Sequence, residues 1–409
     1  MEQKKIIFSP PDISEAEIEE VCATLRSGWL TTGPRTKELE RKIAAYVGTS
    51  KAVCLNSATA AEELNLRILG IGAGDEVLVP AYTYTASAAA AIHVGATVRF
   101  IDVQKDCLEM DYEQMEAAIN EKTKAVIPVD IAGIPCDYEK IYEIVERKRD
   151  LFTAGGNTEL GQRIQKALGR IAVVSDSAHS FGASRKGVMA GSLVDFSSFS
   201  FHAVKNFTTA EGGAAVWKDI PGIDNEEMYR WYQLYSLHGQ SKDALAKDQL
   251  GSWEYDIIAP LYKCNMTDVA AAIGLKQMER YPALLKRRKQ IIAMYDACCD
   301  ELGVEHLTHD TDIYSSSRHL YLSRIPWADD ALRREVITKM AERGVPTNVH
   351  YKPLPMMTAY KNLGFDIKDY PNAYAHYANE ITLPLHTLLS DEDVAFITKN
   401  YKEVVTATH

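Results

Sequence analysis

Several sequence patterns that define large enzyme and binding classes are absent from this chain. It has no GxxxxGK[ST] segment of a phosphate-binding P-loop, no HExxH or CxxC pair and no GxSxG turn of a hydrolase, so we expect no metal site. It also lacks a long basic run, and its net charge at pH 7 is −11. Nucleic acid and anionic membrane surfaces are therefore poor partners, and an anionic ligand must be held by local groups.

Long apolar runs and paired cysteines are also lacking. The least polar long stretch, residues 85–98, is too short to span a bilayer, and the N-terminal MEQKKIIF contains no apolar signal core. The seven cysteines are scattered and odd in number, a pattern that fits reduced thiols. With 409 residues, 46% of them hydrophobic, the chain has the composition of a globular enzyme with a large core. We expect a cytoplasmic protein.

Predicted strands and helices alternate along the first half of the chain. The strands cover residues 52–55, 76–80, 97–102, 125–130, 171–176 and 194–201. The helices cover residues 37–46, 85–94, 111–120, 139–147 and 160–168, and a further helix follows Ser57. This alternation predicts an α/β fold with a doubly wound, mainly parallel sheet, which binds ligands at the carboxyl ends of its strands. Residues 214–218 are predicted as an antiparallel return.

The last third of the chain is predicted as a smaller α+β domain. A long helix over 269–277 begins with Thr267 or Asp268 near its cap, and strands follow at 320–325 and 347–350. Further helices are predicted over residues 331–343, 371–380 and 391–401. We place the domain boundary after the aromatic-rich segment 226–258, so that residues 1–258 form the large domain and residues 259–409 the small one.

Two ionisable side chains lie where predicted strands end. Lys205 follows the strand 194–201, and burial there would lower the pKa of its amine and free it to form a Schiff base with an aldehyde. Asp176 ends a buried strand, with His179 three residues later, and a buried carboxylate needs a partner such as a protonated pyridine nitrogen. The alternatives are a surface lysine, a capping aspartate and a core histidine.

Two further features lie at the same predicted edge of the sheet. The segment Ser57-Ala58-Thr59 links a strand to a helix, and such a helix start offers free N–H groups to a phosphate, although a plain N-cap is the alternative. Tyr84 lies just past a strand, where its ring can stack on a flat ligand or pack in the core. Phosphate donors, a stacking ring, a carboxylate and an amine together describe a pyridoxal phosphate site.

The chain resembles the DegT/StrS family of sugar aminotransferases nearly from end to end. The matching motifs are SGWLTTGP, NSATAA, GDEVLVP, DSAHSFGA, FSFHAVKNFTTAEGG, NMTDVAAAIGLKQ and TLPLH, and they look most like those of enzymes that aminate UDP-4-keto-pentose. The resemblance implies the type I fold of aspartate aminotransferase, pyridoxal 5′-phosphate as cofactor, and a homodimer whose sites are shared between chains. It also implies transfer of an amino group from an amino acid, L-glutamate above all, to a keto group of a nucleotide-linked sugar.

The resemblance also implies a role for each matching residue. Lys205 would hold the cofactor aldehyde and move the proton, and Asp176 would pair with the pyridine nitrogen. Tyr84 would stack on the ring, and His179 would lie near the ring hydroxyl. The implied phosphate ligands are Ser57, Ala58, Thr59 and Ser200, with Lys263 and Asn265 reaching the site of a neighbouring subunit, and the implied sugar contacts are Thr31, His319 and His350.

The chain departs from the family pattern at three places, one of which is Ser175 in place of the usual Glu before Asp176. Leu261 to Asn265 stands where many members read GYN, so the choice between Lys263 and Asn265 stays open. The stretch 148–170 is longer than the family norm, and we expect a structural elaboration, with a substrate lid or partner contact as the alternative. Two rival functions are a sugar dehydratase of the same fold, in which a histidine replaces the lysine, and a non-catalytic sensor that binds pyridoxal phosphate.

Overall fold

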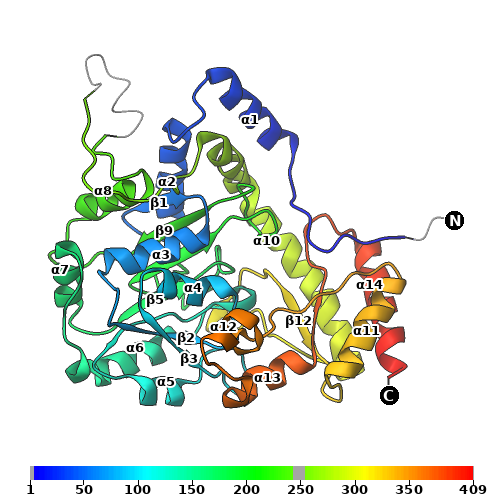
Figure 1. Cartoon of the computed structure of the whole chain (residues 1–409). Coiled ribbons are helices and arrows are strands. Elements are labelled where there is room, and N and C mark those ends of the chain that lie inside the picture. The colour runs from blue at the N-terminus through cyan, green and yellow to red at the C-terminus, as the bar shows by residue number, and fades with distance from the viewer. Residues whose placement is uncertain (1–3, 243–253, 409) are drawn as a thin grey trace.

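The computed structural model describes residues 4–242 and 254–408, and its largest element is a seven-stranded sheet at the centre of Figure 1. The strand order is β1 (Ala52–Leu55), β9 (Gly213–Trp217), β8 (Phe196–Ser200), β5 (Ala172–Asp176), β4 (Thr123–Val126), β2 (Glu76–Pro80) and β3 (Thr97–Ile101). Only β9 runs against its neighbours, because it pairs antiparallel with both β1 and β8. The predicted α/β, mainly parallel type I architecture is confirmed, including the antiparallel return.

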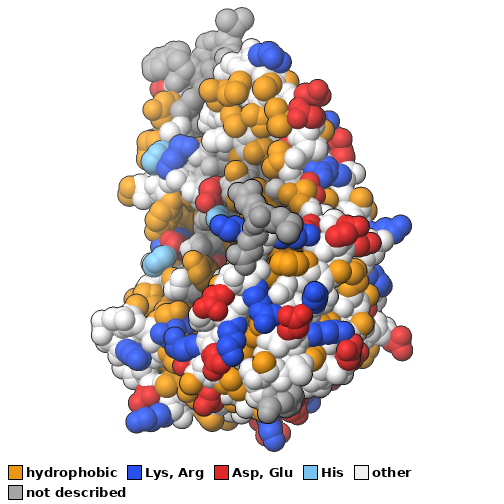
Figure 2. All heavy atoms as spheres, turned by 90° about the vertical axis from the view of Figure 1, so that its right-hand side faces the viewer, with side chains coloured by type: hydrophobic (Ala, Val, Ile, Leu, Met, Phe, Trp, Pro, Cys, Tyr) orange, Lys and Arg blue, Asp and Glu red, His pale blue; other side chains and the backbone are white. Residues whose placement is uncertain are grey.

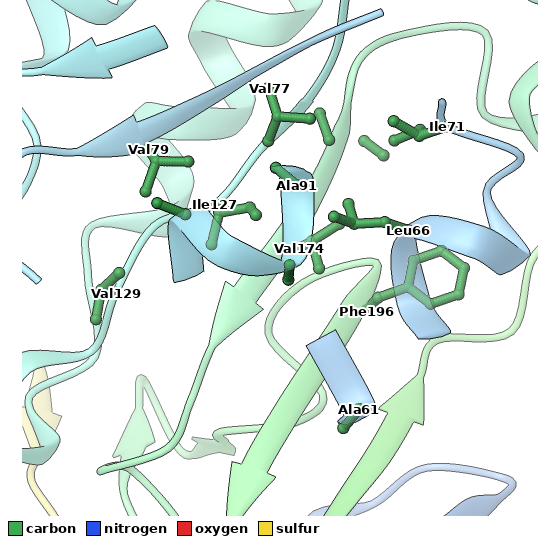
Figure 3. Packing of buried hydrophobic residues seen from close by; sticks show 14 of the residues in the cluster. Ala61, Leu66, Ile71, Val77, Val79, Ala91, Ile127, Val129, Val174 and Phe196 are labelled. Carbon is green, nitrogen blue, oxygen red and sulfur yellow. The ribbon is translucent and has the colours of Figure 1, made fainter. Parts of the chain in front are cut away.

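Helices cover both faces of this sheet because successive strand residues point to opposite sides. On one face, Val77 and Val79 pack with α3 (Ala58–Ile68) and α4 (Thr85–His93), as Figure 3 shows for Leu66 and Ala91. On the other face, Leu78 of the same strand packs against α5 (Tyr112–Ala118) and α6 (Tyr138–Arg147). The remaining helices of this part are α1 (Glu15–Ser27), α2 (Pro34–Val47), α7 (Glu159–Leu168) and α8 (Asn225–Ser236).

A second core lies beside the large sheet. Its antiparallel sheet has the order β10 (Glu305–His306), β12 (Tyr321–Arg324) and β13 (Glu380–Leu383). The helices of this part are α10 (Asp268–Leu302), α11 (Asp330–Glu342), α12 (Thr358–Asn362), α13 (Pro371–Ala378) and α14 (Asp391–Thr406), and a small sheet of β11 (Tyr314–Ser315), β6 (Ser184–Arg185) and β7 (Val188–Met189) links the two parts. Tyr295 of α10 and Tyr401 of α14 are fully buried in this core. A domain boundary at residue 259 stays a prediction.

The structure corrects the predicted strands at two places. The strand predicted over 125–130 is β4, residues 123–126, because Pro128 has no N–H to donate and pairing resumes only as the single bridge of Val129 with Asp176. The segment 347–350 is not a strand. Only Asn348 bridges to Thr382, and the N–H of His350 donates to the Glu380 side chain at 2.9 Å instead.

Two predicted helices have different ends. The helix that begins after the confirmed cap residue Thr267 continues to Leu302, because strong helix formers follow Pro282 and the helix passes through that proline. The helix predicted over 371–380 ends at Ala378, and Glu380 begins the buried strand β13. Residues 243–253 of the aromatic-rich segment, including Trp253, lie outside the described part of the chain.

The long stretch 148–170 forms a short 3-10 turn, Arg149–Leu151, and α7. It packs against the end of α3, where the N–H of Asn157 donates to the carbonyl of Gly70 at 2.9 Å. A Cβ at Gly161 would lie 2.6 Å from the backbone of Gly70, so this close approach requires glycine. None of these residues lines the cavity described below, as expected of a structural elaboration.

Candidate active site

A cavity of about 420 Å³ opens at the carboxyl ends of β1, β2, β5 and β8. Nine of the residues predicted for the site line it, namely Ser57, Ala58, Thr59, Tyr84, Asp176, His179, Ser200, Lys205 and His350. The sheet topology explains this convergence. These four strands run in the same direction, so the segments that follow them meet at one edge, and β9 enters there with Gly212 and Gly213.

The start of α3 forms one wall of the cavity. Ser57 is the N-cap, and its hydroxyl accepts a hydrogen bond from the N–H of Ala60 at 3.1 Å. The N–H groups of Ala58 and Thr59 have no acceptor inside the helix and carry the positive end of its dipole. A Cβ at Gly213 would lie 2.5 Å from the nitrogen of Ala58, so only glycine lets β9 approach the helix start this closely. The wall is suited to an anion.

Asp176 is buried at the end of β5. Its carboxylate accepts hydrogen bonds from the Ser87 hydroxyl at 2.6 Å and from the N–H of Ala178 at 3.1 Å. Among the described residues, none forms an ion pair with it within 4 Å, and burial raises its pKa. A cationic ligand group beside Asp176 would therefore offset the burial of its charge.

Lys205 follows β8 in a tight turn, where its N–H donates to the carbonyl of His202 at 2.9 Å. Its side chain is half-buried, and its amine lies in the cavity. Burial lowers the pKa of this amine to about 8, and the negative charge of Asp176 opposes that shift only in part. A lysine of this kind has a substantial neutral fraction near pH 7 and can act as a nucleophile or base.

His319 lies behind Lys205, with its Nε2 atom 3.5 Å from the lysine Nζ. The other ring nitrogen, Nδ1, is 3.0 Å from Oδ1 of Asn206, whose amide nitrogen donates to the carbonyl of Ser317 at 2.6 Å. Because that amide oxygen only accepts, Nδ1 of His319 carries the proton and Nε2 turns its lone pair to the amine. Burial, followed by the charge of Lys205, lowers the pKa of His319 well below its usual value, so the ring is neutral.

Two more neutral histidines complete the polar lining. His179 accepts a hydrogen bond from the N–H of Ala132 at 3.3 Å, and its Nε2 atom lies 3.1 Å from the hydroxyl of Tyr351. Burial lowers the pKa of His179 well below its usual value and that of His350 to about 4. The carbonyl of His350 accepts a hydrogen bond from Tyr82 at 2.8 Å, which fixes this segment over the cavity.

Tyr84 lies at the mouth of the cavity, with 58% of its surface exposed. Its ring centre is 5.8 Å from that of Tyr351 and tilted to it by 46°. One face of the phenol is therefore open to a ligand, although stacking on a cofactor ring stays a prediction. Ser200 ends β8 and also lines the cavity.

Besides His319, which lies next to Lys205 without lining the cavity, three predicted residues lie outside the cavity of this chain. Lys263 donates a hydrogen bond to Asn265, and Asn265 donates to the hydroxyl of Thr32 at 2.6 Å. Asn265 also bridges to Leu55 at the end of β1, so the segment lies beside the site without lining it. Thr31 is exposed next to it. Lys263 and Asn265 therefore supply no ligand to the cavity of their own chain. Their contact with a neighbouring subunit stays a prediction.

Several residues that line the cavity were not predicted from the sequence. Glu62 lines the cavity from α3, and its signal was a glutamate four residues after Ala58 on an otherwise apolar helix face. Tyr351 comes from the second part of the chain, and only the tertiary fold brings it to this edge. Other missed lining residues are Thr83, Ala86, Val129, Ile131, Ala178, His202, Val204, Glu211 and Gly212.

The described residues contain no cluster of His, Cys, Asp or Glu side chains suited to a metal ion. Within the same part of the chain, no helix is long and apolar enough to cross a membrane.

The chain matches the sequence profile of the DegT/DnrJ/EryC1/StrS aminotransferase family over residues 11–152 and 162–402. The gap between the two matched segments, residues 153–161, falls within the long stretch 148–170. The spore coat polysaccharide biosynthesis protein SpsC of Bacillus subtilis is 35% identical over 414 residues, which cover 99% of both chains. An uncharacterised protein of Methanocaldococcus jannaschii, MJ1066, is also 35% identical and covers 97% of this chain and 96% of its own.

Solved structures give the same picture. Spr1654 from Streptococcus pneumoniae, a protein provisionally described as a sugar aminotransferase, matches in its PMP form with a TM-score of 0.95 and 59% identity, covering 99% of this chain and 100% of that one. Its PLP form matches with a TM-score of 0.94. PseC of Helicobacter pylori, an aminotransferase of pseudoaminic acid biosynthesis, has a TM-score of 0.84 and 25% identity, with coverage of 99% and 100%.

The cavity fits pyridoxal 5′-phosphate, the cofactor held in the PLP form of Spr1654. The buried carboxylate of Asp176 has no ion-pair partner within 4 Å among the described residues and suits a protonated pyridine nitrogen. The free N–H groups of Ala58 and Thr59 suit a phosphate, and the amine of Lys205 suits an aldehyde. Three chemically different groups of one cofactor thus find three matching groups in one cavity.

Proposed function

Since this chain belongs to the DegT/DnrJ/EryC1/StrS aminotransferase family, we propose that it transfers the amino group of L-glutamate to a keto group of a nucleotide-linked sugar. The observation that carries the proposal is the presence of both Lys205 and Asp176 in one cavity, with an amine whose pKa is about 8. At pH 7 about one amine in ten is then neutral, against about one in three thousand for an unperturbed lysine.

Bound pyridoxal phosphate supplies the electron sink that makes a proton on the substrate carbon labile. Lys205 is the group of this chain placed to move that proton, because its amine faces the cavity with a near-neutral pKa. His319 accepts a hydrogen bond from the amine through its bare Nε2 atom and keeps the amine oriented. Asp176 would hold the ring nitrogen through its buried carboxylate, and burial excludes the water that would compete for it.

The names of two relatives support a sugar acceptor and a role in polysaccharide biosynthesis. SpsC is named for spore coat polysaccharide biosynthesis, and PseC for the biosynthesis of pseudoaminic acid. A nucleotide would bring negative charge to a chain of net charge −11, so local groups must hold it. His350 and Tyr351 line the cavity, and we propose that their side chains contact the sugar ring.

We also assign a homodimer, which would place the segment of Lys263 and Asn265 at the partner's site. That segment lies beside the cavity, and α1 next to it exposes apolar side chains, with Ile18 47% and Leu25 53% exposed. Figure 2 shows apolar side chains gathered on the upper part of this face, where α1 lies. A contact between copies of the chain would cover them.

The seven cysteines support a cytoplasmic location. All seven are free thiols, and four of them, Cys54, Cys136, Cys298 and Cys299, are buried. Thiols stay reduced in a reducing compartment such as the cytoplasm, whereas an oxidising compartment favours disulfides.

The test of the proposed function is a product assay. The protein loaded with pyridoxamine phosphate is mixed with a panel of keto-sugar nucleotides, and mass spectrometry detects the aminated sugar. We expect product from wild type and from the control Lys166→Ala, whose lysine is exposed on α7, and none from Lys205→Ala. Release of a dehydrated, unaminated sugar would favour the dehydratase reading instead, and binding without any turnover would favour the sensor.

A further inference from the structure

A second acid, Glu62, lies in the floor of the cavity, and the chemistry described above does not use it. It is the fifth residue of α3, one turn after Ala58 and one turn before Leu66, on the face that packs against the sheet. Only 1% of its surface is exposed. Its side chain meets the hydroxyl of Ser198 on β8, and it lines the cavity together with Asp176.

The hydrogen bonds of Ser198 show which form of Glu62 fits. The Ser198 hydroxyl contacts Oε2 of Glu62 and also lies 3.3 Å from the carbonyl of Ser175. A hydroxyl has one hydrogen and cannot donate to both. If Glu62 carries a proton, it donates to Ser198 and Ser198 donates to Ser175, so both contacts are hydrogen bonds.

The surroundings of the other carboxyl oxygen of Glu62 also favour a protonated side chain. Oε1 is buried and has no hydrogen-bond partner among the described residues. In an ionised carboxylate this unpaired oxygen would carry part of the negative charge. Burying it would cost more free energy than burying the unpaired carbonyl oxygen of a neutral acid. Asp176, in contrast, has a donor for each oxygen, from Ser87 and from Ala178.

The charged groups around Glu62 also favour its protonated form. Asp176 on β5 is the charged group that acts on it, and burial together with that negative charge raises the pKa of Glu62 well above its usual value. Strands β8 and β9, with the sequences FSSFS and GAAVW, carry no acid or base. On α4 the titratable group is His93, which lies 3.0 Å from the neighbouring Glu63 instead.

We propose that Glu62 is a neutral carboxylic acid that leaves Asp176 as the single anion in the floor of the cavity. Glu62 is thus a positioning residue that acts through Ser198 and Asp176. It fixes the place of the one charge that would pair with the ring nitrogen of a bound cofactor. The inference rests on the cofactor chemistry of the family and not on the proposed donor or sugar, so failure of either substrate assay leaves it intact.

The first test is infrared spectroscopy of the complete protein with its cofactor. We expect wild type to show the C=O stretch of a protonated carboxylic acid, shifted in D₂O, that disappears in Glu62→Gln. The matched control is Glu63→Gln, because Glu63 is the next residue of α3 but is paired with Arg67 at 2.8 Å. That control should keep the band. A wild-type spectrum that loses no such band in Glu62→Gln would overturn the proposal.

The second test follows the absorbance of the bound cofactor as a function of pH. A neutral Glu62 predicts the same titration midpoint in wild type and in Glu62→Gln, since glutamine is also neutral and of the same shape. A midpoint lowered by about one pH unit or more in the variant would show that wild type carries a second negative charge there. If Glu62→Gln does not fold, Glu62→Met serves both tests with the same expected results.

Discussion

Replacing Lys205 by methionine should stabilise the cofactor-free protein at neutral pH. The native structure lowers the pKa of this amine from 10.5 to about 8, chiefly by burial, so at pH 7 the folded protein holds a charge that the site disfavours. That difference corresponds to about 3 kcal/mol. Methionine has a similar length and no charge, so Lys205→Met should gain close to this amount.

The gain should depend on pH in a defined way. Below about pH 8 the lysine is charged in both states, and the folded state bears the full cost. Between pH 8 and 10.5 the unfolded chain binds more protons than the folded one, so the stability of wild type rises with pH and the advantage of methionine shrinks. Denaturant unfolding of the cofactor-free proteins at pH 7, 9 and 10.5 measures this difference.

The control for this prediction is Lys166→Met, an exposed lysine of α7 that should change stability by less than about 0.5 kcal/mol at every pH. A Lys205→Met variant that is no more stable than wild type at pH 7 would refute the assignment of Lys205 as a desolvated amine. A gain that is the same at pH 7 and 10.5 would also refute it, since packing alone would then be responsible.

Three further substitutions test the other parts of the site. Asp176→Asn should lower kcat/KM at least about a hundredfold, because the cofactor nitrogen loses its buried anion, and unchanged kinetics would contradict that role. Asn206→Ala should lower kcat about tenfold while cofactor binding, measured by fluorescence titration, stays intact, because His319 is no longer held in one tautomer. Gly213→Ala should raise the dissociation constant of the cofactor about tenfold or more, because the added Cβ displaces the nitrogen of Ala58, and an unchanged constant would count against a phosphate site there.

The large sheet could be predicted where strands are short, fully buried and apolar. The predicted bounds of β1 and β2 coincide with those observed, because every residue of both strands is buried and turn-forming or small residues follow. The small sheet β11-β6-β7 was not predicted, since its two-residue strands have no pattern of their own and form through contacts between distant segments. The path of α10 through Pro282 was missed because the strong helix formers that follow the proline outweigh its local stop signal.

The site residues that could be predicted are those that lie at or just after the ends of strands. Asp176 ends β5 and Lys205 lies in the turn after β8, so a parallel sheet must bring them to one edge. The hydrogen bonds of His319 with Asn206, and of Tyr351 with His179, join residues more than a hundred positions apart. Local sequence contains no signal for such a pairing. Roles for the predicted residues, and any contact of Lys263 with a second subunit, stay predictions.

The central claim, amine transfer through Lys205, is tested most directly by the first half of the reaction. The protein loaded with pyridoxal phosphate is mixed with L-glutamate while the absorbance of the bound cofactor and the release of 2-oxoglutarate are followed together. Our account predicts loss of the lysine-bound cofactor band with one equivalent of 2-oxoglutarate per site, and no such coupled change in Lys205→Ala. A wild-type protein that binds the cofactor but releases no keto acid from glutamate or any other amino donor would contradict it.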